Sequence, residues 1–152
     1  MKKYLLLFSI FILLFIIYSF TSQAEILTVP TEFPTIQSAI TASQIGDTVL
    51  VQDGEYYENL TIRGHGLTLA SLFIIDGDTL HIYNTQIVGA LPGQYGRCLD
   101  IDIIVPQPQT CNIIGLTFTH GRVQCVPNLN DGYGGAIRGG NCEIYFLSLI
   151  HI

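Results

Sequence analysis

The sequence contains little positive charge. Its 152 residues include 12 Asp and Glu but only 6 Lys and Arg, and both lysines, Lys2 and Lys3, lie at the N-terminus. From residue 25 onward, lysine is absent and four arginines remain, at positions 63, 97, 122 and 138. Nucleic acids and anionic membrane surfaces attract proteins through positive charge. We therefore expect no nucleic-acid partner and no electrostatic attachment to a membrane.

Patterns for zinc and phosphate binding are also missing. No Cys-x-x-Cys pair occurs, and the glycine-rich stretch DGYGGAIRGGN lacks the Gly-Lys-Ser/Thr of a phosphate loop. The four cysteines are Cys98, Cys111, Cys125 and Cys142. In an exported chain, an even number of cysteines permits disulfides in several connectivities. We expect Cys98 to pair with Cys111 and Cys125 with Cys142, and buried free thiols are the alternative.

The first 24 residues resemble a secretory signal peptide. Two lysines precede an almost unbroken apolar run over residues 5–20, and Ser22-Gln23-Ala24 supplies small residues for cleavage after Ala24. The alternative is an uncleaved anchor, although the run is shorter than the roughly 20 apolar residues that a spanning helix needs. We expect a secreted, extracellular or cell-surface protein, with membrane contact only through this segment if it stays uncleaved.

One short helix is expected over about residues 35–43. Ile36, Ala39 and Ile40 recur at helical spacing, and Ile45 extends the same series. Thr35 can accept a hydrogen bond from the first turn as an N-cap. Gly46 suits the positive φ that often follows a helix. The apolar stripe must cover another apolar surface.

The rest of the chain has the pattern of short β-strands. Apolar residues alternate and then stop at turns rich in Gly, Asp and Asn; the runs are 26–29, 49–51, 60–62, 67–69, 74–75, 80–83, 99–103 and 114–118. An antiparallel sandwich or barrel and a parallel β-solenoid both turn this often. The runs are short, the turns are irregular, and residues 115–121 look like residues 135–141. These features favour the solenoid.

Two segments resemble a known family. The stretch VPTEFPTIQSAITASQIGDTVLVQDGEYYENLTIRG is similar to the N-terminal coils of right-handed parallel β-helix proteins of the pectin-lyase-like superfamily, and IIGLTFTHG and GYGGAI resemble their recurring coils. The likeness covers about residues 26–140. It implies an all-β, right-handed parallel β-helix (a solenoid) whose first coil is capped by the short helix. The superfamily includes lyases, hydrolases and adhesin-like surface proteins, so the resemblance indicates fold more than activity.

The C-terminal stretch FLSLIHI, residues 146–152, has no charge and no turn residue. Solenoids need a polar cap on their terminal repeat. We therefore expect a β-helix domain over residues 25–145, followed by an apolar tail over 146–152 that is foreign to the fold, and a natural protein that is longer than this chain. A genuine last strand is the alternative.

Few residues suggest chemistry, and no catalytic residue is assigned. Asp100 and Asp102 alternate on one strand face, so they are candidates for binding carbohydrate or Ca²⁺, or for acid–base work with His120. Asp76 and Asp78 form a similar pair on a turn. Two carboxylates are a partial calcium shell, so no cofactor is expected beyond this weak Ca²⁺ reading. The bland interpretation of each pair is a solvated strand face or turn.

Three readings of function remain. The first is a non-catalytic segment of a secreted surface protein that binds polysaccharide or cell-surface glycan, or acts as an adhesin-like spacer. The second is the N-terminal part of a polysaccharide lyase or glycoside hydrolase whose active site lies downstream. The third is a membrane-tethered protein that keeps residues 5–20. His65 and His81 are expected to be structural, and Asn59 begins an Asn-Leu-Thr glycosylation sequon.

Overall fold

The structure is a computed structural model of the whole chain. It describes residues 23–89, 96–103, 110–121, 136–139, 142–145 and 147–150. The expected signal segment lies almost entirely outside the described residues. Within the described part of the chain, no helix is long and apolar enough to cross a membrane.

The described part of the chain is mostly β, with three sheets in which every strand pairing is parallel. The first sheet contains, in spatial order, β1 (Ile26–Val29), β2 (Thr48–Val51), β5 (Thr68–Ser71), β8 (Cys111–Ile114) and β11 (Cys142–Tyr145). The second contains β4 (Leu60–Arg63), β7 (Leu99–Asp102) and β10 (Ile137–Gly139). The third contains β3 (Gly54–Tyr56), β6 (Thr85–Val88), β9 (Thr117–Thr119) and β12 (Ser148–Ile150). β12 lies within the apolar tail, and it pairs with β9.

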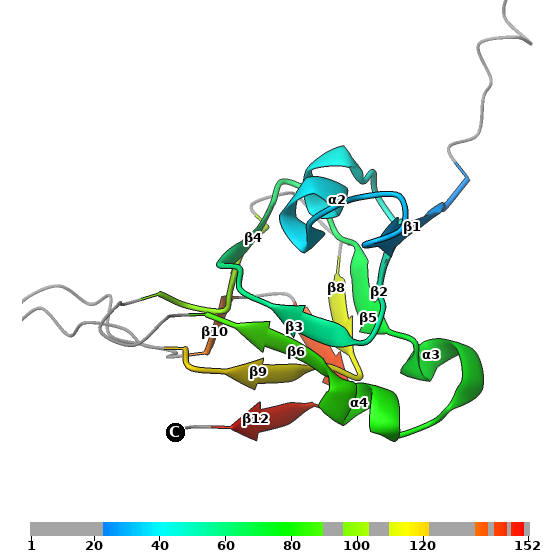
Figure 1. Ribbon diagram of the computed structural model, residues 1–152. Coiled ribbons are helices and arrows are strands. Elements are labelled where there is room, and N and C mark those ends of the chain that lie inside the picture. The colour runs from blue at the N-terminus through cyan, green and yellow to red at the C-terminus, as the bar shows by residue number, and fades with distance from the viewer. Residues whose placement is uncertain are drawn as a thin grey trace, which may run out of the picture.

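The chain visits the sheets in a constant order. From β2 it passes to β3 and β4, then returns to the first sheet at β5 and repeats the circuit through β6 and β7. Figure 1 shows the resulting layers of strands, with α2 (Ile36–Ala42) beside β1 at one end. This arrangement is compatible with a parallel β-helix.

The core consists of like side chains stacked in register. Val49, Leu69 and Ile113 are register partners in three successive strands of the first sheet, and all are fully buried. Ile87 stacks on Phe118 in the same way in the third sheet. Each such side chain stabilises the fold by about 1.5–3 kcal/mol through burial. The apolar alternation in the sequence therefore places one face of each strand inside.

The predicted helix is confirmed as α2. Thr35 is its N-cap: Thr35 Oγ1 accepts from the Ser38 amide at 3.1 Å, and Ser38 Oγ accepts from the Thr35 amide at 3.3 Å. The stripe of Ile36, Ala39 and Ile40 is buried where α2 packs on β1, β2 and β4. Ile45 does not belong to this stripe, because the helix ends at Ala42 and Ile45 is 60% exposed.

Two expected strands are helices instead. The apolar runs at 74–75 and 80–83 lie in α3 (Phe73–Asp76) and α4 (Leu80–Asn84), which leave the stack between β5 and β6 (Figure 1). Most of their large apolar side chains stay outside the core: Ile75 is 63% exposed and Leu80 is 61% exposed, whereas Ile82 is buried. Asp76 and Asp78 favour a turn by accepting hydrogen bonds from nearby amides. The segment from α3 to α4, called the α3–α4 excursion below, is therefore as apolar as a strand in sequence, but most of its apolar side chains are not buried.

The alternation at residues 114–118 is likewise not one strand. β8 ends at Ile114 and β9 begins at Thr117, in a different sheet. Gly115 makes the corner at φ +67°, and a Cβ there would meet Ser71 Oγ at 2.8 Å. The apparent repeat between 115–121 and 135–141 also fails, because β9 and β10 lie in different sheets and β9 pairs with β12.

Candidate functional site

On the outward face of the sheet formed by β4, β7 and β10, polar side chains of neighbouring strands lie side by side as register partners. Leu60 and Ile62 point inward from β4 and are buried, so Thr61 and Arg63 face out. In β7, the alternation of burial likewise places Asp100 and Asp102 on the outer face. Thr61 is in register with Asp100, and Arg63 with Asp102. The structure thus places both predicted carboxylates on one face, beside a cation.

Asp100 is already engaged. Arg138 in β10 donates from Nε to Asp100 Oδ1 at 2.9 Å and from Nη2 to Oδ2 at 2.8 Å. Such bidentate pairs occupy both carboxylate oxygens in a fixed geometry. Among the described residues, no group of three or more His, Cys, Asp or Glu side chains could hold a metal ion. The candidate pair therefore has the form of a strand-to-strand ion pair next to a single exposed carboxylate, Asp102.

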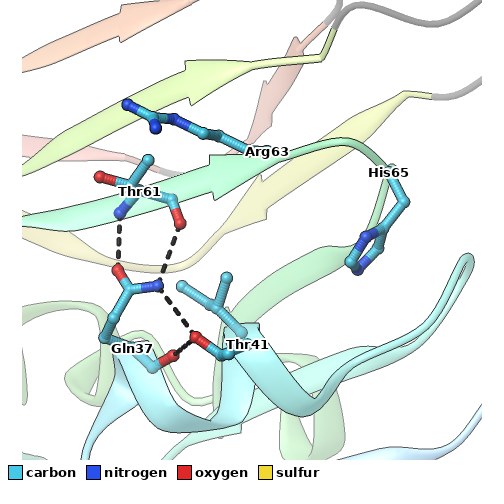
Figure 2. Close-up of a pocket in the computed structure, with 6 residues that line it drawn as sticks. Gln37, Thr41, Thr61, Arg63 and His65 are labelled. Atoms are coloured by element: carbon cyan, nitrogen blue, oxygen red, sulfur yellow. Dashed lines mark hydrogen bonds between the residues drawn. The ribbon is translucent and has the colours of Figure 1, made fainter.

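A groove of about 300 Å³ lies beside this face, between α2 and β4. Its lining residues come from α2, from β4 and from the turn that follows β4: Gln37, Ile40, Thr41, Thr61, Arg63 and His65. Figure 2 shows the polar side chains of the two elements around this space. In the part of the chain that the structure describes, no carboxylate forms an ion pair with Arg63. The groove therefore carries the exposed positive charge of Arg63, although the chain as a whole is acidic.

Gln37 builds one wall of the groove by acting as a neighbour for β4. Its Oε1 accepts from the Thr61 amide at 2.7 Å, and its Nε2 donates to the Thr61 carbonyl at 3.1 Å (Figure 2). β4 stands at the edge of its sheet, so no strand of the described ranges lies beside these two backbone groups. One side-chain amide therefore takes the place of the missing strand and fixes α2 against β4.

His65 forms the far end of the groove. Its Nε2 lies 3.0 Å from Ser43 Oγ, and that hydroxyl donates its hydrogen to the Ile40 carbonyl at 2.7 Å. A hydroxyl has one hydrogen, so the imidazole nitrogen must donate, which leaves Nδ1 as an acceptor in the neutral ring. A second hollow of about 600 Å³, lined by Ser43, Gln44, Ile45 and His65, shares His65 with the groove.

The second polar cluster holds the α3–α4 excursion. His81 Nδ1 lies 2.6 Å from Asp53 Oδ1, and His81 Nε2 lies 3.1 Å from Asp76 Oδ2. Asn84 also donates to Asp53, at 3.1 Å. The hydrogen bond with Asp53 raises the pKa of His81, desolvation opposes that rise, and Asp76 adds to it. The side chains of this cluster form hydrogen bonds with one another, and these bonds attach the α3–α4 excursion to Asp53, which follows β2.

Cys98 and Cys111 do not form the expected pair, and the expected pair of Cys125 with Cys142 is not tested. Cys98, Cys111 and Cys142 are free, and Cys125 lies outside the described residues. Cys98 donates to the Thr119 carbonyl at 3.2 Å, and burial raises its pKa. Cys111 has Cys142 as its register partner in place of Cys98, because β8 pairs with β11.

Two other residues have structural surroundings. Asn59 donates its side-chain amide to the carbonyls of Gly89 and Arg97, so the sequon side chain already ties two segments together. His120 follows β9, in another sheet from Asp100 and Asp102, and has φ 58°. Its buried Nδ1 has no hydrogen-bond partner among the described residues. Most of the glycine-rich stretch after residue 121 lies outside the described residues.

Sequence reasoning did not find the groove. His65 was expected to be structural, and no role was assigned to Gln37 or Thr41. The Arg-Gly-His-Gly turn at 63–66 was the available signal, but nothing local says that this turn lies against α2. In comparisons with known proteins, no family model, no curated protein and no solved structure matches the chain.

Proposed function

We propose that this protein is a secreted, right-handed parallel β-helix of the pectin-lyase-like type, and that it binds carbohydrate at or outside the cell surface without cleaving it. The fold part is supported by in-register parallel pairing and by the constant order in which the chain visits three sheets. The residues of the N-terminal coils that resemble the superfamily support the same assignment.

The groove between α2 and β4 is the observation that carries the binding role. It offers hydroxyl, imidazole and guanidinium groups on a framework fixed by the Gln37 hydrogen bonds. Sugars present hydroxyl groups that need such paired donors and acceptors, and fixed groups lose little entropy on binding. Arg63 adds a cation that can accept the carboxylate of an acidic sugar in a bidentate manner.

The ion pair of Asp100 supports a non-catalytic role for this part of the chain. Glycoside hydrolysis generally requires two carboxyl groups that flank the scissile bond and exchange protons. Arg138 occupies both oxygens of Asp100, which leaves Asp102 as the accessible carboxylate of the pair. The strand that carries the predicted acids is therefore better suited to stability than to proton transfer.

The proposal is tested by binding of the full chain to immobilised polysaccharides, with neutral glucans and polyuronates as separate arms. Arg63→Gln should weaken binding about tenfold, which corresponds to one charged hydrogen-bonded contact. Arg138→Gln is the matched control, because it removes the same charge from the same sheet away from the groove, and it should leave binding unchanged. Equal binding by both variants contradicts the groove, and release of shorter saccharides contradicts the non-catalytic role.

A further inference from the structure

Two cysteines meet in the interior of the fold. Cys111 in β8 and Cys142 in β11 are register partners in a parallel pair, so their side chains leave the same face of the sheet. Cys111 is fully buried, and Cys142 is half-buried and packs against the apolar core. Neighbouring strands lie about 4.7–4.9 Å apart, which is inside the range of about 4.4–6.8 Å that a disulfide requires between Cα atoms.

Each thiol shifts the pKa of the other. The side-chain hydrogen bond between them is the main influence on both groups: it lowers the pKa of Cys142 and raises that of Cys111. The thiolate is the nucleophile in disulfide exchange. Cys142 is both the more accessible and the more acidic sulfur of the pair, so it is the one that attacks an external disulfide.

We propose that Cys111 and Cys142 form a disulfide that links β8 to β11 when the chain meets a low-molecular-weight disulfide. The Cys142 thiolate attacks one sulfur of that reagent, forms a mixed disulfide and releases one small thiol. Cys111 then gives its proton to solvent and attacks the Cys142 sulfur, which forms the protein disulfide and releases the second small thiol. Two protein thiols are oxidised and one external disulfide is reduced.

Cys98 is a poor partner for either sulfur. It precedes β7, in the second sheet, and its thiol is committed to the Thr119 carbonyl. A Cβ on Gly89 would meet Cys98 Sγ at 2.8 Å, so the thiol is tightly enclosed. The bond between Cys111 and Cys142 closes a loop that includes β9 and β10, and it therefore fixes β11 to the strands before it.

The test begins with the reduced full chain, treated with oxidised glutathione, denatured and alkylated. Digestion before aspartate and after arginine separates the cysteines, since Asp100 and Asp102 divide Cys98 from Cys111 and Arg122 divides Cys111 from Cys125. Mass spectrometry should find residues 102–122 linked to residues 139–152. Bridges through Cys98 or Cys125, or complete alkylation of all cysteines, would overturn the proposal.

Thermal unfolding supplies a second measurement with matched variants. Oxidation should raise the Tm of the wild-type chain and of Cys125→Ser by several degrees, because the cross-link restricts the unfolded chain. Cys142→Ser should show no rise, and its half-buried position makes it a milder change than Cys111→Ser. An equal rise in Cys142→Ser would contradict the assignment.

Discussion

The helix α2 and the α3–α4 segment are attached to the sheets in different ways. α2 buries an apolar stripe of Ile36, Ala39 and Ile40, and a cap residue forms hydrogen bonds at each of its ends. The α3–α4 segment exposes most of its large apolar side chains and is held by Ile82, by a hydrogen bond from Thr117 to the Ile82 carbonyl, and by His81 between two carboxylates. Burial fixes the first segment, whereas polar contacts carry much of the attachment of the second.

This difference explains why one segment was predictable and the other was not. A stripe at helical spacing reports burial on one side, and α2 has that stripe. In α3 and α4, residues such as Ile75, Leu80 and Tyr83 are apolar but exposed. Their spacing in the sequence therefore does not indicate which face of the segment is buried. The contrast leads to three predictions about what each segment contributes to stability.

The largest effect is expected from the apolar stripe. Ile36→Ala should lower the free energy of unfolding by about 2–5 kcal/mol, because Ile36 is fully buried and the change leaves a cavity. Ile75→Ala, the matched change in α3, should stay within about 0.5 kcal/mol. Denaturant unfolding of the two variants measures the difference, and similar losses would mean that the two segments are attached alike.

A smaller effect is expected at the beginning of α2. Glu58 accepts hydrogen bonds from the amides of Ile36 and Gln37 at 3.0 and 2.9 Å, so its carboxylate satisfies the first turn of the helix. Glu58→Ala should destabilise the fold by about 1–2 kcal/mol. Glu55→Ala removes an exposed carboxylate whose partner is the Tyr57 hydroxyl, and it should have almost no effect in the same assay.

The smallest effect is a pH dependence of the α3–α4 attachment. The pKa of His81 is raised above its ordinary value of 6.5, chiefly by the hydrogen bond with Asp53. Its contribution to stability is therefore fully present below about pH 6.5 and is lost as the pH rises through the higher pKa of the folded state. The protection of the α4 amides against hydrogen exchange, measured relative to the unfolded chain, should therefore fall over that window.

His81→Gln is the matched variant for this measurement. Glutamine keeps a hydrogen-bonding side chain near Asp53 and Asp76 but cannot titrate. The protection of the α4 amides should therefore show no fall above pH 6.5 in this variant. The protection of the α2 amides should not change over this pH window in either protein, because the stripe that holds α2 is apolar. A step that persists in the variant would assign the titration to another group.

The sequence by itself determined the local elements: β1 at Ile26–Val29, the capped helix from Ile36, and the inward faces of strands such as Leu60–Arg63. These follow from the spacing of apolar residues and from caps that act over three or four positions. The mostly parallel β architecture could be expected on the same grounds, because the runs are short and the turns between them are irregular.

The tertiary structure alone decided which strands stack. Thr48 pairs with Thr68, but Thr68 pairs with Asn112, because the α3–α4 excursion and longer connections from β6 to β7 and from β7 to β8 lengthen one circuit. With no constant period, the sequence cannot show that Cys111 faces Cys142, that His81 reaches Asp53, or that Arg63 and His65 face α2. Each of these contacts depends on the length of chain that leaves the stack between strands, and that length is set by packing of whole circuits rather than by neighbouring residues.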